Sequence, residues 1–324
     1  MNFPHKILMI LLVFFILIFE YCSASLFTNS HNNVLQPLRN ILVTMQHSGS
    51  HFFGGVLGQL KLNGRVVGLG ELCAPSRTDW MGIDCITRIK LMYGLPDVDF
   101  NILSDTAWVT HFPSCKTATD AGECAMETIL SAPMIQMILH ANHGWGDPDW
   151  RKSLFEMRNI YQKVHNIDIK LIILYRTNFI AHHIAASASK RDPNEVLTPV
   201  HLSLPDVVSA NAQRSLLYHQ FFMTMPEKDI SSCLYVTYEH LLNHHETFSA
   251  IARFLEVSTI TQMNVTSDSQ HHTNETGTYL LNLNTVVEEL KENKYPLLNE
   301  CMLHDNCGPI LPEFCNNPKL LCYL

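Results

Sequence analysis

Short apolar runs that end at turn-forming residues recur along the chain. The first, Asn40–Met45, is followed by small polar residues, which is typical of a buried strand in a parallel sheet. Further runs of the same kind occur at Arg65–Leu69, Met134–His140, Lys170–Tyr175 and Cys233–Thr237. Because such strands are apolar on both faces, we expect helices to cover both sides of the sheet.

Helical periodicity fills several of the intervals between these runs. The segments Trp150–His165, Ser209–Met225 and Leu241–Leu255 each place apolar residues on one stripe. Between Cys73 and Cys124, Gly, Pro and Asp interrupt short apolar pieces, so we expect loops and short helices over the sheet. Strands that alternate with amphipathic helices predict an α/β fold class, a parallel sheet flanked by helices, with ligands at the carboxyl ends of the strands.

The first 24 residues have the order of a secretory signal. Lys6 precedes an uninterrupted apolar run, Ile7–Phe19, and small residues around Ala24 follow. Because a bilayer span needs about 20 residues, we expect cleavage after Ala24. An uncleaved signal anchor, extended past Glu20 by Tyr21–Phe27, is the alternative and would be the only attachment to a membrane. Either outcome delivers the chain to the secretory pathway, in the Golgi lumen or secreted.

The remaining sequence predicts one large domain. With 324 residues, 47% of them apolar, the chain has room for one substantial core. We expect a linker at 25–39, the α/β domain at 40–300 and a cysteine-rich tail at 301–324. Two glycosylation sequons, Asn264–Thr266 and Asn274–Thr276, fit a lumenal glycoprotein.

Cysteine usage also fits an oxidising compartment. The tail has no helical or strand period, and its cysteines indicate a disulfide-stapled appendage; a zinc site is the rival, but the tail has no Cys-x-x-Cys pair. Four earlier cysteines allow two further local bridges, and one lies in a strand pattern as a core thiol. The tail set is Cys301, Cys307, Cys315 and Cys322, the earlier set is Cys73, Cys85, Cys115 and Cys124, and the core thiol is Cys233.

The net charge of the chain limits the classes of ligand that we expect it to bind. The formal net charge is -8, and no basic stripe is present, so nucleic acid is not expected as a partner. An anionic ligand would have to be held locally, by backbone amides and a few cations, because the overall field repels it.

A turn of small residues follows the first predicted strand. The turn, Gln46–Ser50, exposes successive backbone N–H groups at the start of a helix, which is the geometry that binds a phosphate or sulfonate. Ser48 and Ser50 add hydroxyl donors. The Gly-Lys-Ser/Thr ending of a Walker A loop is missing, which argues against a Mg²⁺-dependent kinase. An ordinary strand-to-helix turn is the alternative interpretation.

Three segments together resemble the P-loop sulfotransferases. Thr44–Phe53 is similar to the loop that binds the donor's 5′-phosphosulfate, and Lys170–Asn178 is similar to the strand whose terminal arginine binds the donor's 3′-phosphate. Leu234–Leu242 resembles the strand and Tyr-Glu-x-Leu-Leu helix start near the end of the family's core, and we interpret it as structural. With Thr278–Cys301, which resembles the terminal helical region of the bacterial and lipid-sulfating branch, the resemblance covers Asn40–Cys301.

The resemblance implies a P-loop nucleoside-triphosphate-hydrolase-like sheet with sulfotransferase topology. It also implies transfer of sulfonate from 3′-phosphoadenosine 5′-phosphosulfate, without a metal, to a hydroxyl of a carbohydrate or glycolipid. A non-catalytic secreted glycoprotein that keeps the fold to bind a partner or glycan is the alternative. The donor-binding residues that the resemblance implies are Gln46, His47, Ser48, Gly49, Ser50, His51, Arg176 and Ser187.

The sequence departs from the family pattern at two positions. His47 occupies the position where the family's loop has Lys or Arg, so the charge at this position would depend on pH, because the unperturbed pKa of imidazole is about 6.5. The helix serine of the family falls at Ala185, which leaves Ser187 as a displaced substitute. Reduced or lost activity is therefore compatible with the sequence.

The catalytic candidates are Glu71, His47 and His51. Glu71 follows the second strand run, where relatives place a catalytic carboxylate, and it is our candidate general base; a solvated loop residue is the alternative. His51 is a second candidate, although it can equally pack near Phe52 and Phe53 at the helix start. Adjacent histidine pairs point about 100° apart on a helix, so we expect surface or packing roles and no metal site.

Overall fold

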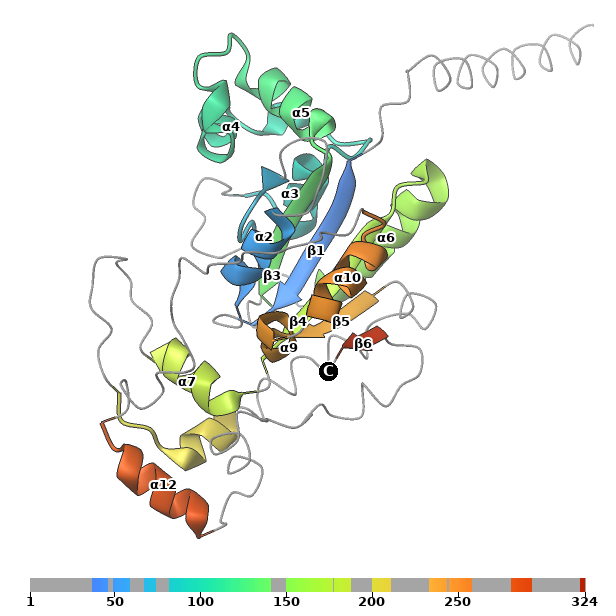
Figure 1. Ribbon diagram of the computed structural model, residues 1–324. Helices are drawn as coiled ribbons and strands as arrows, with labels where there is room; N and C mark the ends of the chain where they lie inside the picture. The colour runs from blue at the N-terminus through green and yellow to red at the C-terminus, as the bar shows by residue number, and fades with distance from the viewer. Residues whose placement is uncertain are drawn as a thin grey trace, which may run out of the picture. The chain divides into compact units, whose positions relative to one another are not determined.

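The parallel sheet expected from the apolar runs is present in the computed structural model and can be followed in Figure 1. Its order is β2-β3-β1-β4-β5-β6, and all neighbouring strands are parallel. The five predicted runs correspond to β1 (Leu38–Thr44), β2 (Val67–Gly68), β3 (Met134–His140), β4 (Ile169–Tyr175) and β5 (Cys233–Thr237). The carboxyl ends of these strands therefore share one edge of the sheet.

A further strand lies where no strand pattern was expected. β6 (Leu321–Tyr323) pairs in parallel with β5, so the expectation of a tail without strands is wrong for these residues. Three residues are too few to display an apolar period, which is why the sequence pattern did not predict the strand. The side chains of the tail cysteines lie outside the described residues, and the tail disulfides stay a prediction.

The structure describes residues 37–45, 49–58, 67–73, 82–140, 150–176, 178–187, 200–210, 233–243, 245–257, 281–292 and 321–323. The chain divides into the units Met1–Gln36 and Pro37–Leu324, and all described residues belong to the second unit. The expected signal, most of the linker and both sequons lie outside the described residues. None of the described helices is long and apolar enough to cross a membrane.

Helices follow the strands along the chain, as the alternation of patterns predicted (Figure 1). They are α2 (Ser50–Gly58), α3 (Cys85–Met92), α4 (Asp105–His111), α5 (Ala121–Ser131), α6 (Trp150–His165), α7 (Phe179–Ser187), α9 (Tyr238–Asn243), α10 (His245–Phe254) and α12 (Leu283–Lys291), with 3-10 turns η2 (Phe100–Ile102) and η3 (Pro113–Cys115) and a helical stretch at 204–210. The expected helix Ser209–Met225 falls mostly outside the described residues.

The core forms two apolar clusters because neighbouring residues of a strand point to opposite faces of the sheet. Along β1, Ile41 and Val43 belong to one cluster and Leu42 to the other. The first cluster includes buried residues of α3, α4, α5 and α6, and the second includes buried residues of α2 and α10. Both faces of the sheet are therefore covered, and each fully buried Leu, Ile or Phe side chain contributes about 1.5–3 kcal/mol.

The described residues between β2 and β3 form short helices and loops, as expected, and two local disulfides connect them. Cys73 is bonded to Cys85, and Cys115 is bonded to Cys124. The expectation of two local bridges among these four cysteines is thus confirmed. Cys233, expected as a core thiol, is buried in β5.

The expected helix Leu241–Leu255 is divided in the structure into α9 and α10. α9 begins directly after β5 because the hydroxyl of Thr237, the last residue of that strand, accepts the N–H of His240 at 3.3 Å. This cap lies four residues before Leu241, where the apolar stripe placed the helix start. It brings Tyr238 and Glu239 to the carboxyl edge of the sheet.

Candidate functional site

Five residues that follow different strands lie along the carboxyl edge of the sheet. In spatial order they are Glu71 after β2, His140 at the end of β3, Gly49 after β1, Arg176 after β4 and Tyr238 after β5. Ligands of parallel α/β sheets bind at this edge. The edge thus has an acid-base pair at one end and a guanidinium beside an aromatic ring at the other.

Gly49 forms the turn between β1 and α2. Its φ of 88° lies in the left-handed region, which glycine adopts without steric cost, and its carbonyl oxygen accepts the first helical bond from Phe53 N at 2.9 Å. A Cβ built on this residue would overlap the ring of Tyr238. Both the backbone conformation and the neighbouring ring therefore require glycine here.

The remaining residues of the expected donor loop are only partly described. Ser50 begins α2 and is buried. Gln46, His47 and Ser48 lie outside the described residues, as does the side chain of His51. Their assigned roles stay predictions.

Arg176 directly follows β4, as its position after the apolar run predicted. It is only 5% exposed, and its guanidinium carbon lies 4.9 Å from the centroid of the Tyr238 ring. Burial lowers the pKa of Arg176, while the carboxylate of Glu239 acts in the opposite direction. An arginine stays protonated under these conditions, so the edge has a buried cation.

Tyr238 connects the turn after β1 with the end of β4. Its half-buried ring contacts Gly49, lies beside Arg176 and meets the ring of Phe52 edge-on at 5.9 Å. Burial raises the pKa of Tyr238, and Arg176 opposes this rise, so the phenol is neutral at physiological pH. The sequence predicts a structural role for the Tyr-Glu pair, and contacts between residues so distant along the chain cannot be predicted from the local pattern.

Glu239 binds the backbone of Asn178, just before α7. Its Oε1 accepts the backbone N–H of Asn178 at 2.9 Å, and Asn178 Oδ1 in turn accepts the N–H of Ala181 at 2.8 Å. The second bond caps the start of α7. Through Glu239 and Asn178, the start of α9 is thereby connected to the start of α7.

Glu71 and His140 form an acid-base pair across β2 and β3. His140 Nδ1 lies 3.3 Å from Glu71 Oε2, with side-chain exposures of 2% for the histidine and 34% for the glutamate. The backbone of the loop stays paired beyond β2, because Gly70 O accepts the N–H of Ile138 at 2.9 Å. His140 was not among our candidates, although its position as the last residue of an apolar run was a usable signal.

Ser187 is an exposed residue at the end of α7. At 1.5 Å per residue it lies about 12 Å along the helix axis from Phe179, which begins the helix near Arg176. Its role in donor binding stays a prediction.

Comparison with known proteins gives likenesses of fold to several solved structures. No family model matches the chain, and no curated protein matches it. The mouse sulfotransferase SULT7A1, solved in complex with PAP, is 12% identical over 83% of this chain and 87% of that chain, with a TM-score of 0.34. The sulfotransferase domain from the curacin biosynthetic pathway is 12% identical over 72% of this chain and 81% of that chain, with a TM-score of 0.32. Likenesses of this size assign no function to the chain.

Proposed function

We propose that this chain is a sulfotransferase that moves sulfonate from 3′-phosphoadenosine 5′-phosphosulfate to a hydroxyl of a carbohydrate or glycolipid. The observation that carries the proposal is that Gly49 and Arg176, the anchors of two separate family-like segments, both contact the ring of Tyr238. Had they lain on different sides of the sheet, one nucleotide could not have reached both.

The two anchors are suited to opposite ends of the donor. The turn at Gly49 leads into the N-terminus of α2, where backbone N–H groups favour a phosphosulfate. Arg176 presents a guanidinium, which matches the bidentate geometry of a phosphate. A neutral tyrosine ring between them adds an apolar surface without adding charge that would repel the donor.

Glu71 is the proposed general base for the acceptor hydroxyl. With 34% exposure it is accessible to an acceptor, whereas His140 is almost fully covered. The His140 imidazole, with Nδ1 3.3 Å from Oε2, lies close enough to position the carboxylate, which stays accessible to the acceptor proton. As the acceptor oxygen bonds to sulfur, the bond from sulfur to the bridging oxygen breaks, and its electron pair leaves on the nucleotide phosphate.

Donor binding tests this proposal. We expect the purified chain to bind 3′-phosphoadenosine 5′-phosphate, more tightly at pH 6 than at pH 8 if His47 contributes its charge. Arg176→Ala should weaken binding about 10- to 100-fold, because hydrogen bonds to charged groups contribute about 1.5–3 kcal/mol. Arg253→Ala, which removes the same charge from an exposed position in α10, is the matched control and should bind like the wild type. Absence of binding at both pH values would contradict the proposal.

A non-catalytic role is the second candidate, and one observation favours it. Ala185 occupies the position where the family's serine is expected, and its substitute, Ser187, is exposed at the far end of α7. A secreted glycoprotein that keeps the fold to bind a partner or glycan would tolerate this loss. Glycan binding without nucleotide binding would support this second candidate.

Delivery to the secretory pathway, to the Golgi lumen or outside the cell, belongs to the same proposal. The disulfides Cys73–Cys85 and Cys115–Cys124 support it, because such bonds persist in oxidising compartments. Expression with and without residues 1–24, followed by detection of the chain in the medium and in membrane fractions, tests it and separates a cleaved signal from an anchor.

A further inference from the structure

The loop that contains Glu71 is held against β3 on its amino-terminal side. Leu69 N donates to Gln136 O at 2.8 Å, and Gly70 O accepts from Ile138 N at 2.9 Å. These bonds extend the pairing of β2 and β3 up to the residue before Glu71. Gly70 has a φ of 58°, so the chain turns there at a residue with wide conformational freedom. The direction of the chain after Gly70 consequently depends on the contacts made by the residues that follow Glu71.

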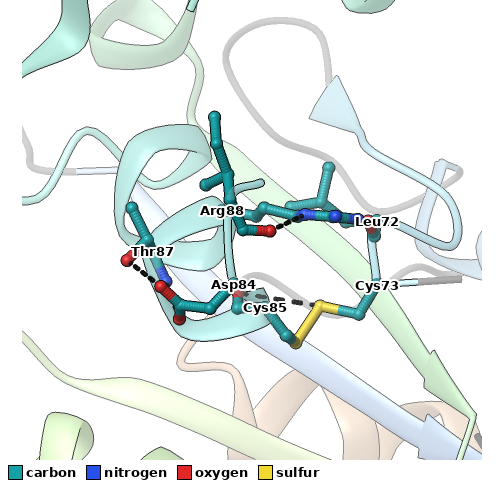
Figure 2. The surroundings of a disulfide bond; sticks show 7 residues. Leu72, Cys73, Asp84, Cys85, Thr87 and Arg88 are labelled. Atoms are coloured by element: carbon teal, nitrogen blue, oxygen red, sulfur yellow. Dashed lines mark hydrogen bonds between the residues drawn. A yellow bond between two sulfur atoms is a disulfide. The ribbon is translucent and has the colours of Figure 1, made fainter. Parts of the chain in front are cut away.

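Two ties hold the carboxyl-terminal side of the same loop, and Figure 2 shows both. Cys73 is bonded to Cys85, the first residue of α3. Arg88, one turn further along α3, donates from one terminal nitrogen to the carbonyl of Leu72 at 3.3 Å. Its Nε donates to the carbonyl of Ile83 at 2.8 Å, so the guanidinium itself is held in place.

The disulfide and the Arg88 bond connect the loop to α3, which is capped and buried. Asp84 caps its start, with Oδ1 accepting from Thr87 N at 3.0 Å. Ile89, Leu91 and Met92 are fully buried in the core cluster of that face. A displacement of the loop would therefore have to strain a buried helix, which interiors packed at crystal-like density resist.

We propose that the Cys73–Cys85 disulfide and Arg88 are positioning groups that hold the carboxylate of Glu71 against His140. The inference rests on the proposed role of Glu71 as the general base. The disulfide limits how far Cys73 can move, and the Arg88 bond fixes the orientation of the Leu72 peptide. The pairing with β3 fixes the backbone before Glu71, and the disulfide and the Arg88 bond fix the backbone after it.

The double variant Cys73→Ala/Cys85→Ala tests the disulfide. Both cysteines are buried, so substitution is a cleaner perturbation than chemical reduction. The readout is the tautomer of His140, measured by ¹⁵N NMR of the labelled chain. We expect the wild type to hold the proton on Nδ1, towards Glu71, and the variant to show a mixture of tautomers.

The matched control is Cys115→Ala/Cys124→Ala. It removes a disulfide of similar span, with a separation of 9 residues compared with 12, from a helical region outside the carboxyl edge. Both double variants should lose similar stability, because the entropic effect of a disulfide depends on the loop it closes. Only the Cys73 variant should change the tautomer of His140. An unchanged tautomer ratio in that variant, or the same change in the control, would overturn the proposal.

Arg88→Gln tests the second tie and serves if the cysteine variant does not fold. We expect a mixture of His140 tautomers and unchanged affinity for 3′-phosphoadenosine 5′-phosphate. We also expect kcat to fall about 10-fold or more, because general base catalysis contributes about 10²–10⁴-fold to the rate. Wild-type tautomer and kcat in Arg88→Gln would contradict the positioning role. Because the tautomer is measured without substrate, it decides the inference even if the chain proves to have no sulfotransferase activity.

Discussion

The guanidinium of Arg176 lies over the ring of Tyr238, with 4.9 Å between its central carbon and the ring centroid. An aromatic face attracts a cation, and this attraction increases when water is excluded, as it is around a residue that is 5% exposed. The pair joins the ends of β4 and β5, and Gly49 brings the turn after β1 to the same ring. Three strand ends are thus held together through one side chain.

Substitution of Tyr238 separates the contribution of the ring from that of its hydroxyl group. Tyr238→Phe keeps the aromatic face and should leave the stability within about 0.5 kcal/mol of the wild type. Tyr238→Leu keeps an apolar group without the face and should cost about 1–2 kcal/mol more than the Phe variant, because the cation–π attraction is lost. Urea unfolding of the two variants measures this difference. Equal stabilities would show that the ring acts only by its volume.

Gly49→Ala should destabilise the chain by more than about 1–2 kcal/mol, which is the cost of a left-handed conformation for a residue with a Cβ. The overlap of that Cβ with Tyr238 adds to the cost. Gly55→Ala is the control within the same helix, since an added Cβ there meets no atom within 4 Å apart from its chain neighbours and the backbone of its own helix, and its φ is not positive. That variant should gain about 0.5–1 kcal/mol, because alanine favours a helix interior. Thermal unfolding compares the two, and a stable Gly49→Ala variant would contradict the assigned geometry.

The ion pair of Lys170 and Glu256 predicts a pH dependence of stability. Lys170 Nζ lies 2.7 Å from Glu256 Oε1, and this hydrogen bond lowers the pKa of the carboxyl below the ordinary value of a glutamate, about 4.5. A lowered folded pKa stabilises the fold above the unfolded pKa, and this contribution is lost as the pH falls through the folded pKa. Glu256→Gln should therefore lose less stability than the wild type when the pH falls below 4.5. Because the Glu256 side chain is 81% exposed, salt should reduce the difference.

Asp84→Ala should destabilise α3 by about 0.5–2 kcal/mol, because Asp84 is the N-cap of that helix. Burial raises the pKa of Asp84, but hydrogen bonds from Thr87 outweigh this effect, and the net shift is downward. The cap is consequently present above the carboxyl's ordinary pKa and is lost in acid. Asp84→Asn, which can still accept the bond, should keep most of the stability and lose its acid dependence. Circular dichroism across a pH series distinguishes the variants.

The sequence predicted the sheet well because its strands are buried on both faces. β3 and β5 have the predicted bounds, and β1 and β4 differ from prediction by one or two residues at their ends. Such runs have no competing interpretation once their length is known. β6 was missed because it is short, and the break between α9 and α10 was missed because an apolar stripe continues through it.

The site was predictable only where a residue follows directly from a strand. Arg176 and Gly49 occupy the expected positions because the ends of parallel strands define one edge. Tyr238 was not selected, since its contacts with Gly49 and Arg176 cross strands and no local pattern encodes them, whereas His140 could have been selected as the last residue of an apolar run. The pair of Glu71 and His140 needed the register of β2 against β3, which depends on the folded sheet.

The position of β1 has a consequence for biosynthesis. β1 lies between β3 and β4, so its backbone partners are residues 134–140 and 169–174. During translation the apolar side chains of Ile41, Leu42 and Val43 leave the ribosome long before either neighbour exists. The nascent chain therefore exposes an unpaired apolar segment until residues 134–174 have been synthesised, the kind of segment that chaperones shield from aggregation.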